Sequence, residues 1–210
     1  MTQEKRDFNK DAAAWDENPG RVKMAESAFD AIDGNMKLSK EMDILDFGCG
    51  TGLLSLKLLP YVHSVTGADS STGMLEVLNS KITAQNLSGI KTLYIDIDKG
   101  TAIPGTYDAV TSSMTMHHIK EPAALIKQFY NVIKPGGFLC IADLDTDNGK
   151  FHDNSDGVFH EGFQRDEMKK FYKDAGFTGI TDVTAAEISK PDKDGNMNSF
   201  TIFLIVGKKG

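Results

Sequence analysis

Three glycines at alternate positions, Gly48, Gly50 and Gly52, lie between a short apolar run and a leucine-rich segment. Glycine lets the backbone turn tightly and approach a ligand with no Cβ atom in the way. A helix after such a loop would also present unpaired N–H groups and the positive end of its dipole to an anion. The spacing is therefore typical of a nucleotide or nucleoside site, although a tight strand-to-helix turn alone would give the same pattern.

Carboxylates accompany this loop on three successive predicted strands. Asp46 precedes the glycines, Asp69 lies 23 residues further on, and Asp96 closes the next predicted strand. A carboxylate at the end of the second strand of such a unit can accept hydrogen bonds from the two hydroxyls of a ribose. One such residue could simply be solvated, but three along one edge of a sheet indicate a nucleoside site.

The spacing of the glycines distinguishes two nucleoside cofactors. A dinucleotide loop follows G-x-G-x-x-G, which would require a glycine at position 53, where this chain has Leu53. The spacing here is G-x-G-x-G, with Asp46 directly before it. A carboxylate there would repel a pyrophosphate and attract the ammonium of a nucleoside that carries an amino acid. These features favour S-adenosylmethionine over NAD, and an NAD-dependent oxidoreductase is kept as an alternative.

The elements that must position these residues alternate between strand and helix. Apolar runs bounded by turn residues predict strands at 43–47, 62–69, 91–97, 107–113 and 138–144. Helical spacing of apolar residues predicts helices around 22–32, 53–59, 71–82 and 122–133. Pro60 and the KPGG segment at 134–137 are expected to end two of these helices. Alternation at this length predicts a parallel, doubly wound sheet.

The last part of the chain follows a different pattern. Residues 165–177 read as a helix ended by Gly176, and two β-rich runs at 180–188 and 199–207 are joined by turn-forming residues. The chain should therefore close with an antiparallel pair of strands. The predicted fold is one α/β domain with a Rossmann-like, doubly wound seven-stranded sheet, mostly parallel, that ends in an antiparallel β-hairpin.

Composition and charge argue against several functional classes. The 210 residues carry 23 Lys and Arg against 30 Asp and Glu, a net charge of −7, with no basic run. Nucleic-acid affinity depends largely on clustered Lys and Arg, so we expect no nucleic-acid partner. No apolar run approaches the roughly 20 residues that span a bilayer, and the charged start does not resemble a secretory signal. Cys49 and Cys140 have no metal-type spacing, which suits a reducing cytoplasm.

Several motifs together resemble one enzyme family. The segments ILDFGCGTG at 44–52, VTGADSSTGML at 65–75, MTMHHI at 114–119 and IKPGGFL at 133–139 resemble motifs of the class I S-adenosylmethionine-dependent methyltransferases. The 12-residue interval between Asp96 and Asp108 is also similar to that family. The resemblance covers roughly residues 40–145 and points to the methyltransferase domain 11/12 branch, of small-molecule and quinone type. In this family the seventh strand is antiparallel and lies beside the fifth, which agrees with the predicted hairpin.

The resemblance implies a role for each matching residue. The three loop glycines would hold the methionine part of S-adenosyl-L-methionine, and Asp46 or a water beside it would face the ammonium. Asp69 would bind the ribose, Asp96 with the Ile97 N–H would bind the adenine edge, and S-adenosyl-L-homocysteine would be the product. The predicted cofactor side is completed by Trp15, Cys49, Ser70, Met74, Ser112 and Ser113. Of these, Ser112 and Ser113 would lie near the sulfonium, and Cys49 is expected to be a small space-filling residue.

The N-terminal segment at 8–21 is similar to the lid of this branch. Phe8 and Trp15 would pack over the cofactor and exclude water. Trp15 could equally anchor the first helix to the core.

The acceptor side carries less specific signals. Methyl transfer from a sulfonium is an in-line displacement that needs alignment, and it needs a base only if the acceptor must lose a proton. His117 and His160 are the predicted catalytic residues, and His118, Asp143, His152 and Phe163 are predicted to contact the acceptor. The acids and histidines after 143 could hold a metal, but solvated loop carboxylates are the simpler interpretation and no metal is predicted. Arg165 is expected to begin a helix, with an acidic acceptor as its alternative partner.

The sequence therefore predicts a single domain over 1–210. Its parts are a helical lid at 1–38, a cofactor-binding core at 42–145, an acceptor-side insert at 146–165, and a C-terminal helix and hairpin at 166–210. The predicted function is methyl transfer to an unidentified small molecule. One alternative is a quinone-type ring C-methyltransferase with a larger apolar pocket, to which Phe151, Phe159 and Phe163 could contribute. Another is a regulator or partner subunit that binds S-adenosylmethionine without turnover.

Overall fold

A computed structural model describes residues 7–147, 149–151, 155–191 and 196–210. Its sheet has seven strands in the order β3-β2-β1-β4-β5-β7-β6, and the first five are parallel while β7 runs antiparallel between β5 and β6. The strands are β1 (Asp43–Phe47), β2 (Ser64–Asp69), β3 (Ile90–Tyr94), β4 (Tyr107–Ser113), β5 (Ile133–Leu144), β6 (Phe177–Pro191) and β7 (Met197–Lys209). The predicted fold class is confirmed.

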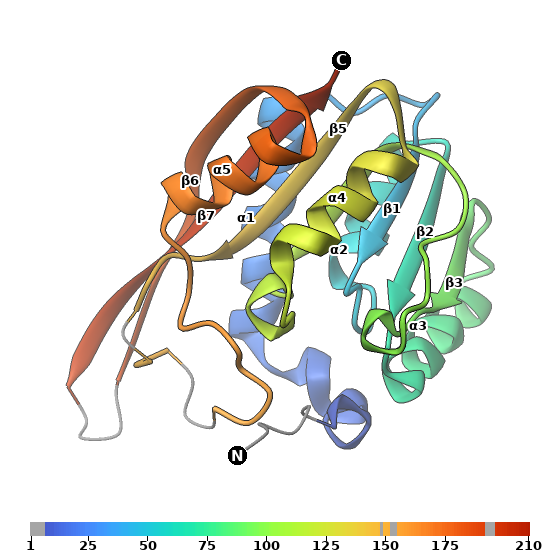
Figure 1. The fold of residues 1–210 in the computed structure, drawn as a ribbon. Coiled ribbons are helices and arrows are strands. Elements are labelled where there is room, and N and C mark those ends of the chain that lie inside the picture. The colour runs from blue at the N-terminus through green and yellow to red at the C-terminus, as the bar shows by residue number, and fades with distance from the viewer. Residues whose placement is uncertain (1–6, 148, 152–154, 192–195) are drawn as a thin grey trace.

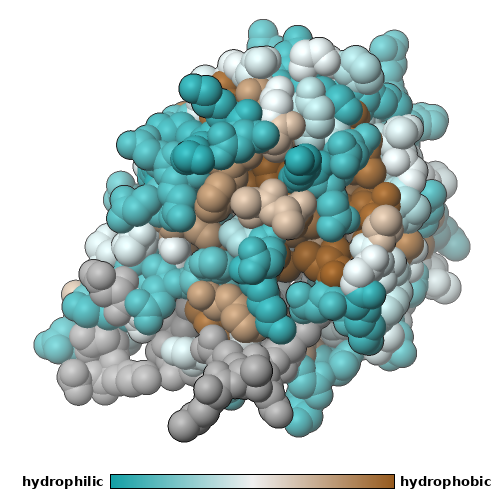
Figure 2. Space-filling model, viewed as in Figure 1, coloured by the Kyte–Doolittle hydropathy of each residue, from teal (hydrophilic) through white to brown (hydrophobic). Residues whose placement is uncertain are grey.

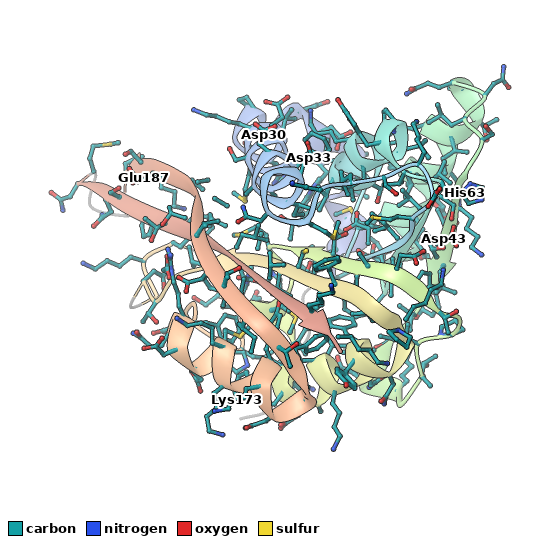
Figure 3. The ribbon with its side chains drawn as sticks, turned by 90° about the horizontal axis from the view of Figure 1, so that it is seen from above. Asp30, Asp33, Asp43, His63, Lys173 and Glu187 are labelled. Carbon is teal, nitrogen blue, oxygen red and sulfur yellow. The ribbon has the colours of Figure 1, made fainter. Side chains whose placement is uncertain are left out.

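Helices cover both faces of this sheet (Figure 1). The α-helices are α1 (Pro19–Met36), α2 (Leu53–Leu58), α3 (Thr72–Ala84), α4 (Pro122–Val132) and α5 (Arg165–Ala175). Short 3-10 helices span Phe8–Lys10, Ala12–Glu17, Leu59–Tyr61, Ile97–Lys99 and Met116–His118. Figure 3 shows that Asp33 of α1 and Lys173 of α5 lie on opposite sides of the sheet.

The two faces bury separate apolar clusters because successive side chains of a strand point to opposite faces. In β1, Leu45 packs in the cluster that includes residues of α4 and α5, whereas Ile44 packs in the cluster that includes residues of α1 and α2. A strand buried on both faces reads as a continuous apolar run, which is why β1, β4 and β5 were recognisable. Apolar side chains gather over α4 on the face shown in Figure 2, among mostly hydrophilic residues.

Two expected boundaries were wrong. Strand β3 ends at Tyr94, so Asp96 lies beyond it, at the start of the 3-10 helix Ile97–Lys99. The KPGG segment lies inside β5, which begins at Ile133, where a bulge shifts the pairing with β4. The bulge brings Gly137 so close to β4 that a Cβ atom there would lie 2.4 Å from the carbonyl oxygen of Asp108. Gly137 therefore allows the two strands to approach each other closely.

The parallel strands all end at one edge of the sheet, where the N-terminal segment also lies (Figure 1). The opposite edge is seen in Figure 3, where Asp43 and His63 lie near each other at the starts of β1 and β2. There Lys134 contacts the carboxylates of Asp43 and Asp108, at 3.6 and 2.8 Å. In open α/β sheets ligands bind outside the carboxyl ends of the strands. A site is therefore expected at the end of the sheet where the parallel strands finish and the N-terminal segment lies.

Candidate functional site

The glycine loop after β1 is held in a conformation that only glycine adopts without strain. Gly48, Gly50 and Gly52 have φ angles of 72°, 54° and 84°. A Cβ atom on Gly48 would lie 2.2 Å from Thr115 Oγ1, and one on Gly52 would lie 2.4 Å from Leu78 Cδ1. A Cβ atom on Gly50 would have nothing nearer than 3.9 Å. Gly48 and Gly52 are therefore required by packing within the protein, while Gly50 presents bare backbone to open space.

That space is a cavity of about 190 Å³ at the carboxyl ends of β1, β2 and β4. Eleven of the predicted residues line it: Trp15, Asp46, Gly48, Cys49, Gly50, Asp69, Ser70, Met74, Ile97, Ser113 and His118. Seven others do not contribute to its lining, namely Gly52, Asp96, Ser112, His117, Asp143, His160 and Phe163. His152 falls outside the described residues. The structure thus assembles most of the predicted cofactor side and little of the predicted acceptor side.

Asp46 forms a buried carboxylate in this lining, with 1% of its surface exposed. Its two oxygens accept hydrogen bonds from the hydroxyls of Ser55 and Thr111, at 2.5 and 3.1 Å. Burial raises the pKa of Asp46 to about 6, despite these two hydroxyl bonds. At neutral pH the group is mostly ionised, so it places a negative charge where a cationic group of a ligand could be bound.

Asp69 lies at the end of β2 and connects the loop to the next helix. It accepts hydrogen bonds from the backbone N–H groups of Gly50 and Ser71, each at 2.8 Å. Ser71 in turn caps α3 by accepting from the N–H of Met74. The carboxylate therefore fixes the loop and also lines the cavity.

The third predicted carboxylate is turned away from the cavity. Asp96 is 8% exposed and lies 3.3 Å from the ammonium of Lys99. The lining after β3 comes instead from Ile95, Ile97 and Asp98. The reason is the early end of β3, because the chain turns into a 3-10 helix and changes which side chains face the site.

Cys49 lines the cavity but its thiol is directed at protein atoms. A Cβ atom on Gly67 of β2 would lie 3.1 Å from Cys49 Sγ, so the sulfur packs against that strand. Burial raises the pKa of the Cys49 thiol well above its ordinary value. This geometry suits a space-filling residue.

The N-terminal segment lies over the cavity, and its first attachment is to the start of α3. Asn9 Oδ1 accepts hydrogen bonds from the Gly73 N–H at 2.7 Å and from the Ser71 hydroxyl at 2.9 Å. Ser71 and Gly73 belong to the first turn of α3 and its cap. The Asn9 amide therefore attaches the first 3-10 helix to the element that follows Asp69.

A second attachment joins the segment to the glycine loop. Asp16 accepts a hydrogen bond from the Thr51 hydroxyl at 2.5 Å and forms an ion pair with Lys81. Lys81 also donates to the Thr51 carbonyl at 2.7 Å. Asp16, Thr51 and Lys81 thus connect the lid, the loop and α3.

Trp15 and Arg21 form the part of the lid that contacts the cavity directly. The guanidinium of Arg21 lies 3.7 Å from the centre of the Trp15 ring, and Arg21 also donates to the Trp15 carbonyl at 3.2 Å. Phe8 packs edge-on against Trp15 and against His118, with ring centres 5.9 and 5.1 Å apart. Trp15 therefore lines the cavity and contacts the first turn of α1, and its role as a lid stays a prediction.

The end of β4 forms another wall and carries an unusual backbone conformation. Met114 has a φ of 53°, uncommon for a residue other than glycine, and its N–H donates to the Ala142 carbonyl at 2.9 Å. Met114 lines the cavity together with Ser113 and Thr115. Ser112 points away and is fully buried, and its hydroxyl has no hydrogen-bond partner among the described residues.

The two adjacent histidines have different surroundings. His117 is 1% exposed, and its Nδ1 lies 2.7 Å from Asp143 Oδ1. Asp143 also accepts from the N–H groups of Met116 and Leu144, at 2.8 and 2.7 Å. Burial alone would raise the pKa of Asp143, but His117 and the two N–H groups hold it below its ordinary value. His117 and Asp143 therefore form a buried structural pair, and only His118 reaches the cavity.

Two further acceptor-side residues also have structural contacts. His160 Nε2 lies 2.9 Å from the Ile119 carbonyl, and its ring packs 5.0 Å from that of Phe163. Phe163 is 3% exposed and belongs to the core cluster beside α5. Neither residue lines the cavity, so the structure does not bring them to the site.

Asp145 and Asp147, the first two acids after β5, each have a partner in the protein. Arg165 begins α5, as expected, and contacts Asp145 and Asp182 at 2.6 and 3.3 Å. Asp147 accepts hydrogen bonds from the N–H groups of Gly149 and Phe151.

In the described part of the chain no three His, Cys, Asp or Glu side chains are grouped to hold a metal. Within the same residues no helix is long and apolar enough to cross a membrane.

Sequence patterns did not reveal several lining residues. Arg21, Met24 and Ala25 come from α1, Thr115 follows β4, and Gly157 comes from the loop after β5. The stretch before α1 was expected to contribute a lid, but nothing in the spacing singled out Arg21. No pattern in the neighbouring sequence marks Gly157 as a lining residue, because its position beside the cavity depends on the path of the loop after β5.

Comparisons with known proteins agree with this geometry. Residues 44–137 match the protein family described as a methyltransferase domain. A protein of Schizosaccharomyces pombe named an uncharacterized methyltransferase is 34% identical over 161 residues, which is 70% of this chain and 57% of that one. A ubiquinone biosynthesis O-methyltransferase of Colwellia psychrerythraea is 35% identical over 108 residues, or 50% of this chain and 43% of that one. The chain thus spans about half the length of these curated relatives.

Solved structures are also similar over most of the chain. A phosphoethanolamine N-methyltransferase of Haemonchus contortus, in complex with S-adenosyl-L-methionine, superimposes with a TM-score of 0.70. The match covers 88% of this chain and 52% of that one, at 16% identity. The chain therefore carries a methyltransferase domain with the fold of the class I S-adenosylmethionine-dependent methyltransferases.

Proposed function

We propose that this protein transfers a methyl group from S-adenosyl-L-methionine to a small molecule and forms S-adenosyl-L-homocysteine. The observation that carries the proposal is the cavity beside Gly50, where bare loop backbone meets the carboxylates of Asp46 and Asp69. A methyltransferase domain over 44–137 supports it. When bound, the cofactor would supply a methyl group already activated by a positive sulfur.

The chain's own residues would bind and orient. Gly50 leaves room for the methionine part, Asp46 attracts its ammonium, and Asp69 accepts from the ribose hydroxyls. Ile95 and Ile97 offer an apolar wall for the adenine ring of the cofactor. Trp15 would exclude water from the cavity. A water-poor site favours this displacement, because the reaction creates no new charge that water would have to solvate. Of the predicted lid at 1–38, the described residues 7–18 would act as the lid, because α1 packs in the core through Ala28, Ile32 and Met36. Residues 146–165 would shape the acceptor side.

An oxygen acceptor is favoured over a ring carbon. The ubiquinone biosynthesis relative named above is an O-methyltransferase, and the C-methyltransferase alternative would require a larger apolar pocket. Phe163 is committed to the core and Phe151 packs against Phe200, which leaves little aromatic surface from these residues for such a pocket. We therefore propose a hydroxyl-bearing small molecule as the acceptor. Both cysteines of the chain are free thiols, which supports a reducing compartment such as the cytoplasm.

Calorimetry tests the donor part of the proposal. S-adenosyl-L-homocysteine should bind, and NAD should not. Asp69→Ala should weaken binding more than tenfold, because it removes both the ligand contact and the brace on Gly50. Asp98→Ala is the matched control for an exposed carboxylate at the rim, and it should have a smaller effect. Binding of NAD without S-adenosyl-L-homocysteine would overturn the proposal.

Turnover separates the enzyme from a regulator that only binds. Incubation with S-adenosyl-L-methionine and a panel of hydroxyl, amine and thiol compounds should release S-adenosyl-L-homocysteine with at least one of them. Tight cofactor binding without release on any compound would favour the regulator.

A further inference from the structure

The part of the cavity lining that follows β4 is largely apolar. Met114 and Ile119 come from the segment after β4, and Phe8 packs edge-on against His118 of the same segment, with ring centres 5.1 Å apart. All three apolar side chains line the cavity and are half-buried. In the sheet order β4 lies on the other side of β1 from β2, which ends at Asp69. This apolar part of the lining therefore lies across β1 from the carboxylate proposed to bind the ribose.

Polar side chains in this part of the lining contact the protein's own backbone. The Thr115 hydroxyl can donate to the carbonyl oxygen of Ser113 at 3.1 Å or to that of Gly48 at 3.4 Å. His118 Nδ1 lies 2.7 Å from the carbonyl oxygen of Gly157. Among the described residues, the segment after β4 thus brings no carboxylate, ammonium or guanidinium to the cavity.

The charged side chains of the neighbouring segments are engaged elsewhere. Asp143 is fully buried, and its Oδ1 lies 2.7 Å from His117 Nδ1. The ammonium of Lys120 lies 5.3 Å from the centre of the Phe159 ring, and Arg165 forms ion pairs with acids of the protein. These charged groups do not belong to the cavity lining. A charged acceptor would therefore not meet them inside the cavity.

The charged side chains that do line the cavity belong to the donor side. In the described part of the chain they are Arg21, Asp46, Asp69 and Asp98, and His118 adds a cation only when it is protonated. Asp46 and Asp69 are proposed to bind the ammonium and the ribose, and Arg21 is the cation that the cofactor's carboxylate would meet. Asp98 is exposed and follows β3, beyond β2. The donor thus engages the charges that an acceptor could otherwise use.

We propose that the methyl acceptor is an uncharged molecule whose apolar part packs against Phe8, Met114 and Ile119. The inference rests on the proposed methyltransferase function and narrows its hydroxyl-bearing acceptor to one without a carboxylate, phosphate or ammonium group. A charged group that moves from water onto an apolar surface loses its hydration and gains no ion pair. The positive sulfur of the donor would also repel an ammonium, and Asp46 and Asp69 would repel an anion. An apolar ring gains from burial against the same three side chains.

The test compares three ring compounds that differ in one substituent, which is neutral in 4-methylcatechol, anionic in 3,4-dihydroxybenzoate and cationic in 3,4-dihydroxybenzylamine. Calorimetry measures their binding to the protein loaded with S-adenosyl-L-homocysteine. The measurement is made at pH 8, above the usual histidine pKa of about 6.5. The neutral compound should bind at least about tenfold more tightly than either charged one, because it keeps no unpaired charge in the cavity.

A cation placed in this part of the lining should change the preference. Met114→Lys and Ile119→Lys should each improve binding of 3,4-dihydroxybenzoate relative to 4-methylcatechol by roughly tenfold, because the new ammonium can pair with the carboxylate. The matched control is Met197→Lys, which adds the same charge at an exposed position of β7 outside the cavity lining. It should leave the order of the three compounds unchanged.

Binding of S-adenosyl-L-homocysteine is measured first and separates two kinds of failure. No binding to the unaltered protein would count against the methyltransferase function itself. Where the donor side is intact, equal binding of the three compounds, tighter binding of a charged one, or no binding of 4-methylcatechol would overturn the proposal. So would a gain for the anion in Met197→Lys that matches the gain in the two cavity variants. The comparison on the unaltered protein stands even if a variant fails to fold.

Discussion

Among the described residues that line the cavity, Asp46 is the most deeply buried carboxylate. Its carboxylate is almost fully enclosed, yet it is one wall of the cavity. Two hydroxyl donors, Ser55 and Thr111, partly replace the water that burial removes. The balance leaves a pKa of about 6, high enough to titrate near neutral pH. A ligand cation beside Asp46 would add the attraction that the free protein lacks.

The pH dependence of cofactor binding should follow Asp46. Its pKa in the folded protein is raised above the ordinary value of 3.8 to about 6. The folded state therefore gains protons relative to the unfolded one as pH falls through about 6, and the ionised form that attracts an ammonium is lost there. Titrations of S-adenosyl-L-homocysteine from pH 8 to pH 5 should show affinity falling below about pH 6. Asp46→Asn should bind more weakly at pH 8 and show little change with pH; an unchanged profile would remove Asp46 from the site.

Arg21 should recognise the carboxylate of the cofactor's amino-acid part. Among the described residues that line the cavity, it is the one Lys or Arg side chain. A charge-assisted hydrogen bond is worth about 1.5–3 kcal/mol, so Arg21→Ala should weaken S-adenosyl-L-homocysteine binding roughly tenfold or more. Binding of 5′-methylthioadenosine, which lacks the amino-acid part, should change little. The exposed Lys23→Ala is the control. Equal losses for both ligands would mean that Arg21 acts only through its packing on Trp15.

Among the elements, the N-terminal lid is the one that we expect to move when ligands enter. The cavity of about 190 Å³ is smaller than the 300–1,000 Å³ usual for ligand pockets. The lid is held by a few polar contacts, at Asn9 and at Asp16, rather than by a large apolar face. Opening it therefore costs few interactions, as a segment that gates a site requires.

Weakening these contacts should speed ligand exchange. The double variant Asn9→Ala with Asp16→Ala should release S-adenosyl-L-homocysteine several-fold faster, because the closed lid is no longer fastened to α3 and the loop. Trp15 is the one tryptophan of the chain, so stopped-flow fluorescence reports the lid directly. Lys10→Ala, an exposed residue of the same segment, is the control. Identical release rates in the double variant and the unaltered protein would show that entry does not depend on the lid.

An element could be predicted where its own residues carry the pattern, and could not where its position depends on contacts with distant segments. Strands β1, β4 and β5 are buried on both faces, so their apolar runs marked them clearly. The end of β3 was misplaced because Tyr94, Ile95 and Ile97 continue an apolar pattern while the backbone already turns into a 3-10 helix. On the donor side, Gly50 and Asp69 are adjacent in space because the βαβ unit dictates it. On the acceptor side, His118 and Gly157 meet through a loop whose path has no periodic signal.

Across the whole molecule, the loop after β5, which we propose shapes the acceptor side, is anchored to the C-terminal strands. Arg165 contacts Asp145 after β5 and Asp182 on β6, and Thr201 of β7 also donates to Asp145. Lys169 reaches the same Asp182, and its hydrogen bond lowers the pKa of that carboxyl. The loop after β5 thus starts from a network that joins α5 to the hairpin.

Removing the centre of this network should affect the acceptor before the donor. Arg165→Ala leaves the partly buried Asp145 without its cation, while Asp182 keeps Lys169, and this should lower the free energy of unfolding by about 1–3 kcal/mol. Turnover should fall because the loop that holds Gly157 loosens, while S-adenosyl-L-homocysteine affinity stays within twofold. Urea unfolding and calorimetry check the two parts. Asp166→Ala, at the exposed next position, is the control. A matching loss of donor affinity would show that the two sides are not separable.

The loop at 145–164 begins and ends on the same Asp145–Arg165 contact, so it can be regarded as a replaceable module. The residues proposed to bind the donor lie on the N-terminal segment, the start of α1, β1, the glycine loop, the end of β2 and the segment after β3, all upstream of that contact. Insertions or deletions inside the module would change the shape of the proposed acceptor side without disturbing the residues proposed to bind the donor. During divergence, such a layout lets new acceptor preferences arise by exchange of one short segment, while the machinery that handles the methyl donor is inherited unchanged.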